Sequence, residues 1–241
     1  MIPVRDHNPT FGPVWVVWAL VIASLAGFVV PWLTAGDGGL VEAAWRFGSI
    51  PAAIRADPGG QALGLVAHAF LHGGWIHLIG NLLFLWVFGD NVEDRLGHAR
   101  FLVFYLLGVA FAALSHALLT SDPSLPLIGA SGAISAVLGA YVRLYPLKRV
   151  QAVVVPLLPP WLVLRVLWGA PPFFLWTLPA WAYLGYWAAL QVWEGVAAAG
   201  VVGGGVAWWA HVGGFVFGVL LVPLFARRPP TSGHLAGSIN P

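Results

Sequence analysis

The sequence predicts an all-α polytopic membrane protein, a bundle of six transmembrane helices with both termini in the cytoplasm. Three observations lead to this prediction. Hydrophobic residues make up 59% of the 241 residues and charged residues only 8%, whereas a soluble domain has about 25% charged residues. Long apolar runs recur and do not alternate with polar residues as β-barrel strands would. Most of the Lys and Arg residues fall on one side of the predicted spans.

Six apolar segments are each close to the roughly 20 residues that a bilayer requires. In chain order they are 14–33, 68–88, 101–120, 127–145, 175–194 and 207–225. A competing stretch, 150–168, contains three prolines and Arg165. Because prolines break helices and a mid-span arginine is costly, we expect an interfacial loop there, with a seventh span as the alternative. The long mixed segment 34–60 is expected to fold onto the outer membrane surface.

The positions of the basic residues orient these spans. One side carries nine of the eleven Lys and Arg, and the other carries only Arg46 and Arg55. The nine are Arg5, Arg95, Arg100, Arg143, Lys148, Arg149, Arg165, Arg227 and Arg228. The positive-inside rule makes the richer side cytoplasmic. The predicted organisation is a cytoplasmic tail at 1–13, one membrane domain at 14–226 and a disordered cytoplasmic tail at 227–241.

Composition also limits the function classes. The chain has no cysteine, which excludes disulfides and thiol catalysis. Its basic residues follow membrane orientation and form no continuous patch, so a nucleic-acid partner is not expected. With no organellar presequence evident and a minimal six-span core, we expect a multi-pass protein of the bacterial plasma (inner) membrane. No cofactor is expected, and the oligomeric state is left open.

Polar residues inside the spans point to a site, because polar groups at membrane depth are costly and mark function. Ser131 in the fourth span and His211 in the sixth each lie about four residues below the outer end, roughly 6–8 Å deep. His77 and Asn81 in the second span are i and i+4 and share one helix face. A lone serine or histidine usually serves packing, but four such groups in one layer favour a functional site.

Small residues supply a second constraint. They recur at every fourth position of two spans: Ser131, Ser135 and Gly139 in the fourth, and Ala210, Gly214 and Gly218 in the sixth. Such stripes let two helices approach closely. We expect them to bring the His211 imidazole within bonding reach of Ser131, while Gly129 and Gly132 leave room for a substrate backbone and expose N–H groups.

This arrangement predicts nucleophilic catalysis. Ser131 would be the nucleophile, His211 its base, and His77 with Asn81 a donor cluster for an oxyanion. Because neither Asp nor Glu lies in the fourth or sixth span, we infer a Ser–His dyad rather than a triad.

Three motifs resemble the rhomboid family of intramembrane serine proteases. They are "HAFLHGGWIHLIGN" (68–81), "GASG" (129–132) and "AHVGGFVFG" (210–218), in the family's order, within a resemblance that covers roughly residues 60–225. It implies a six-helix bundle that cleaves transmembrane protein substrates in the lipid bilayer. It also implies that Ser131 and His211 are catalytic, and that His77, Asn81 and the Ser131 backbone N–H stabilise the oxyanion.

The resemblance extends to further residues. It implies that His72, and with it His68, lie near a water-accessible cavity, and that Glu93 and Arg95 belong to a structural loop motif. One departure concerns Ser135, because members of the family often carry a tyrosine there that stacks on the catalytic histidine. His116, near the end of the third span, is interpreted as a boundary residue.

Two alternatives stay open. One is a catalytically inactive rhomboid relative that binds membrane clients, although such proteins typically lose the serine or the histidine. The other is a membrane metal site or transporter, because His68 and His72 have the i, i+4 spacing that can hold zinc. Against a metal site, the sequence has no HExxH motif.

Overall fold

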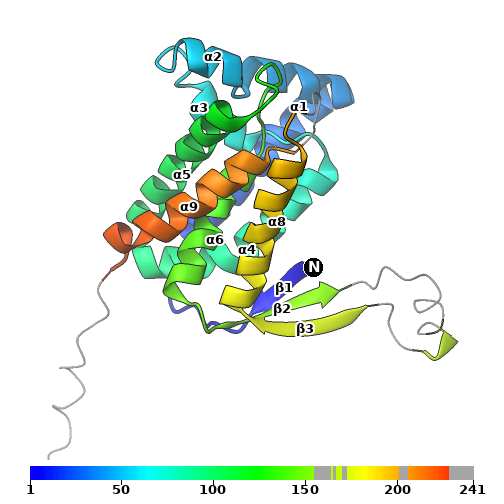
Figure 1. Cartoon of the computed structure of the whole chain (residues 1–241), viewed down its shortest axis with the longest axis vertical. Helices are drawn as coiled ribbons and strands as arrows, with labels where there is room; N and C mark the ends of the chain where they lie inside the picture. Colours follow the sequence, from blue (N-terminus) through cyan, green and yellow to red (C-terminus); the bar gives the residue numbers. More distant parts are fainter. Residues whose placement is uncertain (155–163, 165–166, 170–172, 201–205, 228–241) are drawn as a thin grey trace, which may run out of the picture.

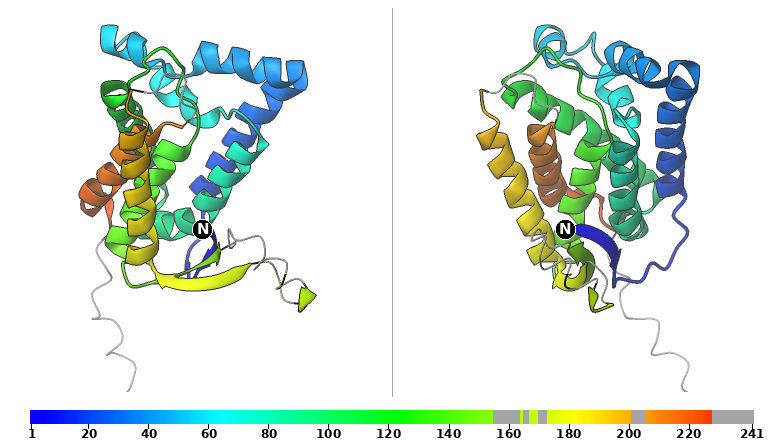
Figure 2. Two further views of the ribbon diagram at one scale, coloured as in Figure 1. Left: turned by 45° about the vertical axis from the view of Figure 1, so that its right-hand side comes forward. Right: turned by 90° about the vertical axis from the view of Figure 1, so that its right-hand side faces the viewer.

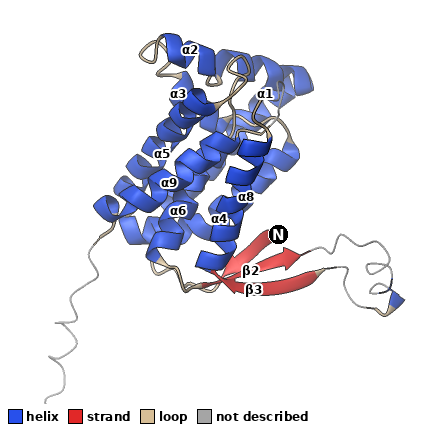
Figure 3. Cartoon of the chain, in the orientation of Figure 1, coloured by secondary structure: helices blue, strands red, loops and turns tan. Residues whose placement is uncertain are grey.

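The computed structural model describes residues 1–154, 164, 167–169, 173–200 and 206–227. Within them, a bundle of helices carries a small antiparallel sheet at one end (Figure 3). The predicted loop at 150–168 and the predicted tail at 227–241 fall largely outside the described residues.

Helix α1 (Trp15–Phe47) is longer than the predicted first span because a second arm follows it. The helical geometry breaks at Ala35 and Gly36, where Gly36 has φ 56°, a left-handed conformation that glycine adopts without strain. Helices α2 (Pro51–Ala56) and α3 (Gly64–Ala67) follow. The second arm of α1 and α2 lie across the end of the bundle away from the sheet (Figures 1 and 2).

Helices occupy all six predicted segments, but glycines make two of these helices begin later than predicted. The expected second span begins with a short 3₁₀ turn, η1 (His68–Phe70), and its helix α4 (Trp75–Leu96) starts only after Gly73 and Gly74. The fourth begins at Ser131, as α6 (Ser131–Leu144), because Gly129 has φ 116°. The predicted starts at 68 and 127 are therefore wrong. The predicted start at 175 is also wrong, because Phe174–Pro179 form a strand and the helix begins at Ala180.

The remaining helices are α5 (His98–Leu119), α8 (Ala180–Ala197) and α9 (Trp208–Phe225). In the described part of the chain, α1, α4, α5 and α9 are long and apolar enough to cross a membrane, and α6 is a shorter apolar helix. The polar side chains of Gln191 and Glu194 interrupt the apolar sequence of α8, which is not among these four.

Glycines bring α6 and α9 into backbone contact. A Cβ added at Gly139 would overlap the Phe215 carbonyl oxygen, and one added at Gly214 would overlap that of Gly132. A Cβ at Gly218 would overlap the Ala136 carbonyl oxygen in the same way. The small-residue stripes therefore face each other, as their spacing predicts.

The sheet was not anticipated from the sequence. Strands β1 (Ile2–Asp6), β2 (Arg149–Val154) and β3 (Phe174–Pro179) are antiparallel in the order β1-β2-β3. Strand β2 alternates in burial, and its Val150 and Ala152 are fully buried. The sequence before α1 thus contains a strand, and the Tyr141 hydroxyl of α6 donates a hydrogen bond of 2.5 Å to Asp6.

Glu93 fixes the start of α1. Its buried carboxylate accepts hydrogen bonds from the Val16 and Val17 N–H groups, at 2.9 and 2.7 Å. The same carboxylate lies 2.6 Å from Nδ1 of His98. Because the first N–H groups of a helix have no intrahelical partner, this contact caps α1 and joins it to α4.

Candidate active site

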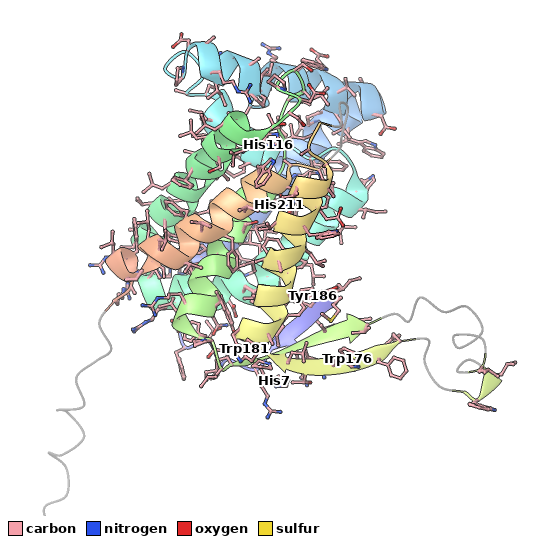
Figure 4. All side chains as sticks on the ribbon, in the orientation of Figure 1. His7, His116, Trp176, Trp181, Tyr186 and His211 are labelled. Carbon is pink, nitrogen blue, oxygen red and sulfur yellow. The ribbon has the colours of Figure 1, made fainter. Side chains whose placement is uncertain are left out.

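Ser131 and His211 meet where α6 and α9 begin. Ser131 is the first residue of α6 and His211 the fourth of α9. The Ser131 Oγ lies 2.8 Å from Nε2 of His211, which is hydrogen-bond distance. His211 lies in the half of the bundle away from the sheet, whereas His7 and Trp176 lie at the sheet (Figure 4).

A third polar side chain, Gln191 of α8, joins this pair. Its Oε1 lies 2.7 Å from Nδ1 of His211, on the opposite side of the imidazole from Ser131. Its Nε2 donates to the Trp187 carbonyl oxygen at 3.4 Å. Gln191 was not predicted from the sequence, because only Asp and Glu in the fourth and sixth spans were considered as partners of His211. The available signal was a glutamine in an otherwise apolar stretch.

Two tryptophans lie beside the imidazole, on which the family that the motifs resemble often stacks a tyrosine from the position of Ser135. The ring centroids of Trp187 and Trp208 each lie 6.1 Å from that of His211, with interplanar angles of 37° and 87°. Ser135 does not reach His211, because its hydroxyl turns back to the Ser131 carbonyl oxygen at 2.6 Å. Neighbouring helices therefore supply the aromatic contact that α6 lacks.

His77 and Asn81 belong to α4 and lie against the backbone of Gly129, on the other side of Ser131 from His211. A Cβ added at Gly129 would lie 2.6 Å from His77 Nε2 and 3.7 Å from Asn81 Nδ2. The Gly73 N–H donates to His77 Nδ1 at 3.5 Å, so the proton of the neutral ring is on Nε2, the nitrogen that lies next to Gly129. Asn81 Nδ2 is buried and has no hydrogen-bond partner among the described residues. Both side chains offer donors to a group beside Ser131.

His68 and His72 support this wall from behind. Each is 2% exposed, and neither is among the described residues that line the cavity. The His68 carbonyl oxygen accepts from the Gly129 N–H at 2.9 Å, and the His72 ring packs edge-on against His77 with centroids 5.1 Å apart. Both histidines therefore lie next to the cavity wall, where they contact Gly129 and His77, and their expected part in water access stays a prediction.

These groups line a cavity of about 1190 Å³. Its walls include Ser131, His211, Gln191, His77 and Asn81. His116 of α5 also lines it, so the interpretation of that residue as a mere boundary position is incomplete. Among the residues that the structure describes, no group of three or more His, Cys, Asp or Glu side chains is arranged to hold a metal ion.

Comparison with known families agrees with these features. The family model described as Rhomboid domain matches residues 59–228. The chain belongs to the rhomboid family. This rhomboid domain contains every polar residue of the cavity wall named above and begins after the second arm of α1.

Curated relatives share this domain over part of their length. The presenilin-associated rhomboid-like protein A, mitochondrial, of Danio rerio is 33% identical over 100 residues, which are 41% of this chain and 26% of the relative. Rhomboid protein 1, mitochondrial, of Saccharomyces cerevisiae is 30% identical over 116 residues, 46% of this chain and 34% of the relative. Rhomboid protease GlpG of Yersinia pestis is 32% identical over 74 residues, 31% of this chain and 26% of the relative. The matched stretches thus span about a quarter to a third of these relatives.

Proposed function

We propose that this rhomboid is an intramembrane serine endopeptidase that cleaves transmembrane segments of other membrane proteins. The observation that carries the proposal is the 2.8 Å approach of Ser131 Oγ to His211 Nε2 in a large cavity of an apolar bundle. In this proposal Ser131 is the nucleophile and His211 is the general base.

The reaction follows from this pairing. His211 Nε2 removes the Ser131 hydroxyl proton while Oγ forms a bond to the scissile carbonyl carbon. The carbonyl oxygen becomes an oxyanion, and collapse of this intermediate breaks the C–N bond as His211 returns the proton to the leaving amine. Water, activated by the same imidazole, then hydrolyses the acyl-enzyme. No step requires a metal or an organic cofactor.

Three groups are placed to stabilise the oxyanion. Ser131 opens α6, so its own N–H has no intrahelical acceptor, and the helix dipole favours negative charge there. His77 Nε2 and Asn81 Nδ2 approach the adjoining Gly129 backbone from α4, and Asn81 Nδ2 has no hydrogen-bond partner in the part of the chain that the structure describes. One well-placed donor of this kind is worth about 3–4 kcal/mol of transition-state stabilisation.

The proposed topology has six spans, with α6 and α8 crossing beside the four longer helices. The chain termini and the sheet then face the cytoplasm, as the excess of Lys and Arg on that side requires. The cavity opens near the opposite surface, where a substrate helix can unwind. We propose the bacterial plasma membrane as the location, by analogy with a bacterial relative; two other matched relatives carry mitochondrial names.

Cleavage of a single-span reporter in proteoliposomes tests the proposal. We expect wild-type protein to cut the reporter within or beside its membrane segment, and Ser131→Ala and His211→Ala to be inactive while still folding. Wild-type-like cleavage by either variant would contradict the dyad. Wild-type protein that binds reporters and cuts none of them would instead favour the inactive, client-binding alternative.

A further inference from the structure

Gln191 offers an acceptor to the imidazole that the proposed reaction uses. It is 7% exposed and comes from α8, a third helix beside those that supply Ser131 and His211. Nothing in the dyad chemistry requires a glutamine at this place, and burying an amide in an apolar bundle is costly unless its polar atoms are paired. The two hydrogen bonds of the Gln191 amide, to His211 and to the Trp187 carbonyl oxygen, offset that cost and indicate what the side chain does.

The orientation of the amide follows from its own backbone. A side-chain amide has one acceptor oxygen and one donor nitrogen. The Gln191 nitrogen lies 3.4 Å from the Trp187 carbonyl oxygen, which can only accept. The amide oxygen is thereby left to face His211 Nδ1 at 2.7 Å.

The orientation of the amide decides the protonation of the ring. An oxygen acceptor at 2.7 Å requires that Nδ1 carry the proton. A neutral imidazole has a single N–H, so Nε2 is then unprotonated and presents its lone pair to Ser131 Oγ, 2.8 Å away. The other tautomer would place a lone pair against the Gln191 oxygen and a proton against the serine hydroxyl, and could not act as the base.

We propose that Gln191 is a positioning residue that holds His211 in its base-competent tautomer, making the site a Ser–His–Gln relay. This inference rests on the proposed function. The hydrogen bonds run in one direction: Ser131 donates to His211, His211 donates to Gln191, and Gln191 donates to the Trp187 carbonyl oxygen. The amide is neutral, so it orients the imidazole without attracting a proton to it as a carboxylate would.

The relay also accounts for Ser135. A stacked tyrosine restrains the plane of the histidine ring, whereas a hydrogen bond at Nδ1 restrains both its plane and its proton. In this chain Ser135 bonds back to its own helix, and α8 supplies both Gln191 and the neighbouring Trp187 ring. In this chain, residues of α8 therefore restrain the His211 ring, in place of a tyrosine on α6.

Two substitutions separate positioning from packing. Gln191→Met keeps the length of the side chain and removes the acceptor, whereas Gln191→Glu keeps an acceptor. Gln151→Met, the same chemical change on strand β2, is the matched control. We expect Gln191→Met to lower kcat at neutral pH by about 10- to 100-fold with KM changed less than about twofold, because a misoriented imidazole would lose part of the roughly 10²- to 10⁴-fold that a positioned base contributes. Gln191→Glu should recover most of kcat, with the acid limb of its pH profile moved to higher pH.

Wild-type kcat in Gln191→Met would overturn the relay, and so would a Gln191→Glu variant as impaired as Gln191→Met. A second readout does not depend on proteolysis. In ¹⁵N-histidine-labelled protein, the proposal predicts an imidazole N–H signal, assigned by its absence in His211→Ala, that persists in Gln191→Glu and is lost to solvent exchange in Gln191→Met. If wild-type protein shows that signal and cuts no reporter, the proposed function fails while the hydrogen bond stands; if the signal is absent, the relay fails.

Discussion

Gly214 of α9 lies directly against the Gly132 carbonyl oxygen of α6, one residue beyond Ser131. This backbone contact sets the separation of the two helices whose first turns carry the proposed nucleophile and base. The distance between Ser131 and His211 is therefore a property of helix packing as much as of the two side chains.

Replacing Gly214 by alanine tests this packing. The added Cβ would overlap the Gly132 carbonyl oxygen, so the helices must separate. We expect a loss of about 1–3 kcal/mol in stability and at least about a tenfold loss of cleavage, since general-base geometry tolerates little lengthening. Gly185→Ala in α8 is the matched control, because no atom of the described residues outside its own helical segment lies within 4 Å of the added Cβ. Thermal unfolding in detergent and reporter cleavage measure both effects; equal results for the two variants would contradict the account.

Asn81 should contribute to the rate and little to substrate binding. Its amide nitrogen, which has no partner among the residues with a described position, is proposed to meet the oxyanion only as negative charge develops. We expect Asn81→Ala to lower kcat by about 10²- to 10³-fold with KM nearly unchanged. Asn81→Asp should be worse, because it replaces a donor by a negative charge. If Asn81→Ala raised KM and left kcat intact, Asn81 would serve substrate binding instead.

Strand β1 gives the fold a pH-dependent contact at the end away from the site. Burial raises the pKa of Asp6 from its ordinary value of 3.8 to about 6, an effect that the Tyr141 hydrogen bond partly opposes and nearby Asp90 reinforces. Because the folded state holds this proton more tightly than the unfolded chain, the stabilisation is complete below about pH 4 and is lost as pH rises through 6.

Asp6→Asn should remove this part of the pH dependence. As the pH rises from 4 to 7, we expect the unfolding temperature of the wild-type protein to decrease relative to that of Asp6→Asn. Only the wild-type protein has a buried carboxyl group at this position that loses its proton. Asp37→Asn, at an exposed position of α1, should keep the wild-type slope. Parallel curves for wild type and Asp6→Asn across this range would contradict the assignment.

The sequence predicted the positions of the helices well because apolar runs of spanning length are a strong local signal. It misplaced the starts of α4 and α6 because Gly73, Gly74 and Gly129 interrupt runs that hydropathy alone treats as continuous. It also started α8 five residues too early, because the apolar residues of β3 precede that helix without a break. It missed the sheet because β1 pairs with β2 across some 145 residues. No local pattern reports a pairing of that range.

The site shows the same division. Ser131, His211, His77 and Asn81 were named from motif and depth, and the structure brings them to one cavity. Gln191 was not named, and His116 was interpreted only as a boundary residue, because the groups around each of them come from other helices. Only the packing of α8 and α5 around the cavity reveals them.

Activity-based labelling shows whether Ser131 is an activated nucleophile. Purified wild-type protein is treated with a fluorophosphonate, which reacts with activated serines, and the modified peptide is located by mass spectrometry. The account predicts one adduct, on Ser131, that is absent from Ser131→Ala and strongly reduced in His211→Ala. An adduct on another serine, or labelling unchanged in His211→Ala, would contradict it.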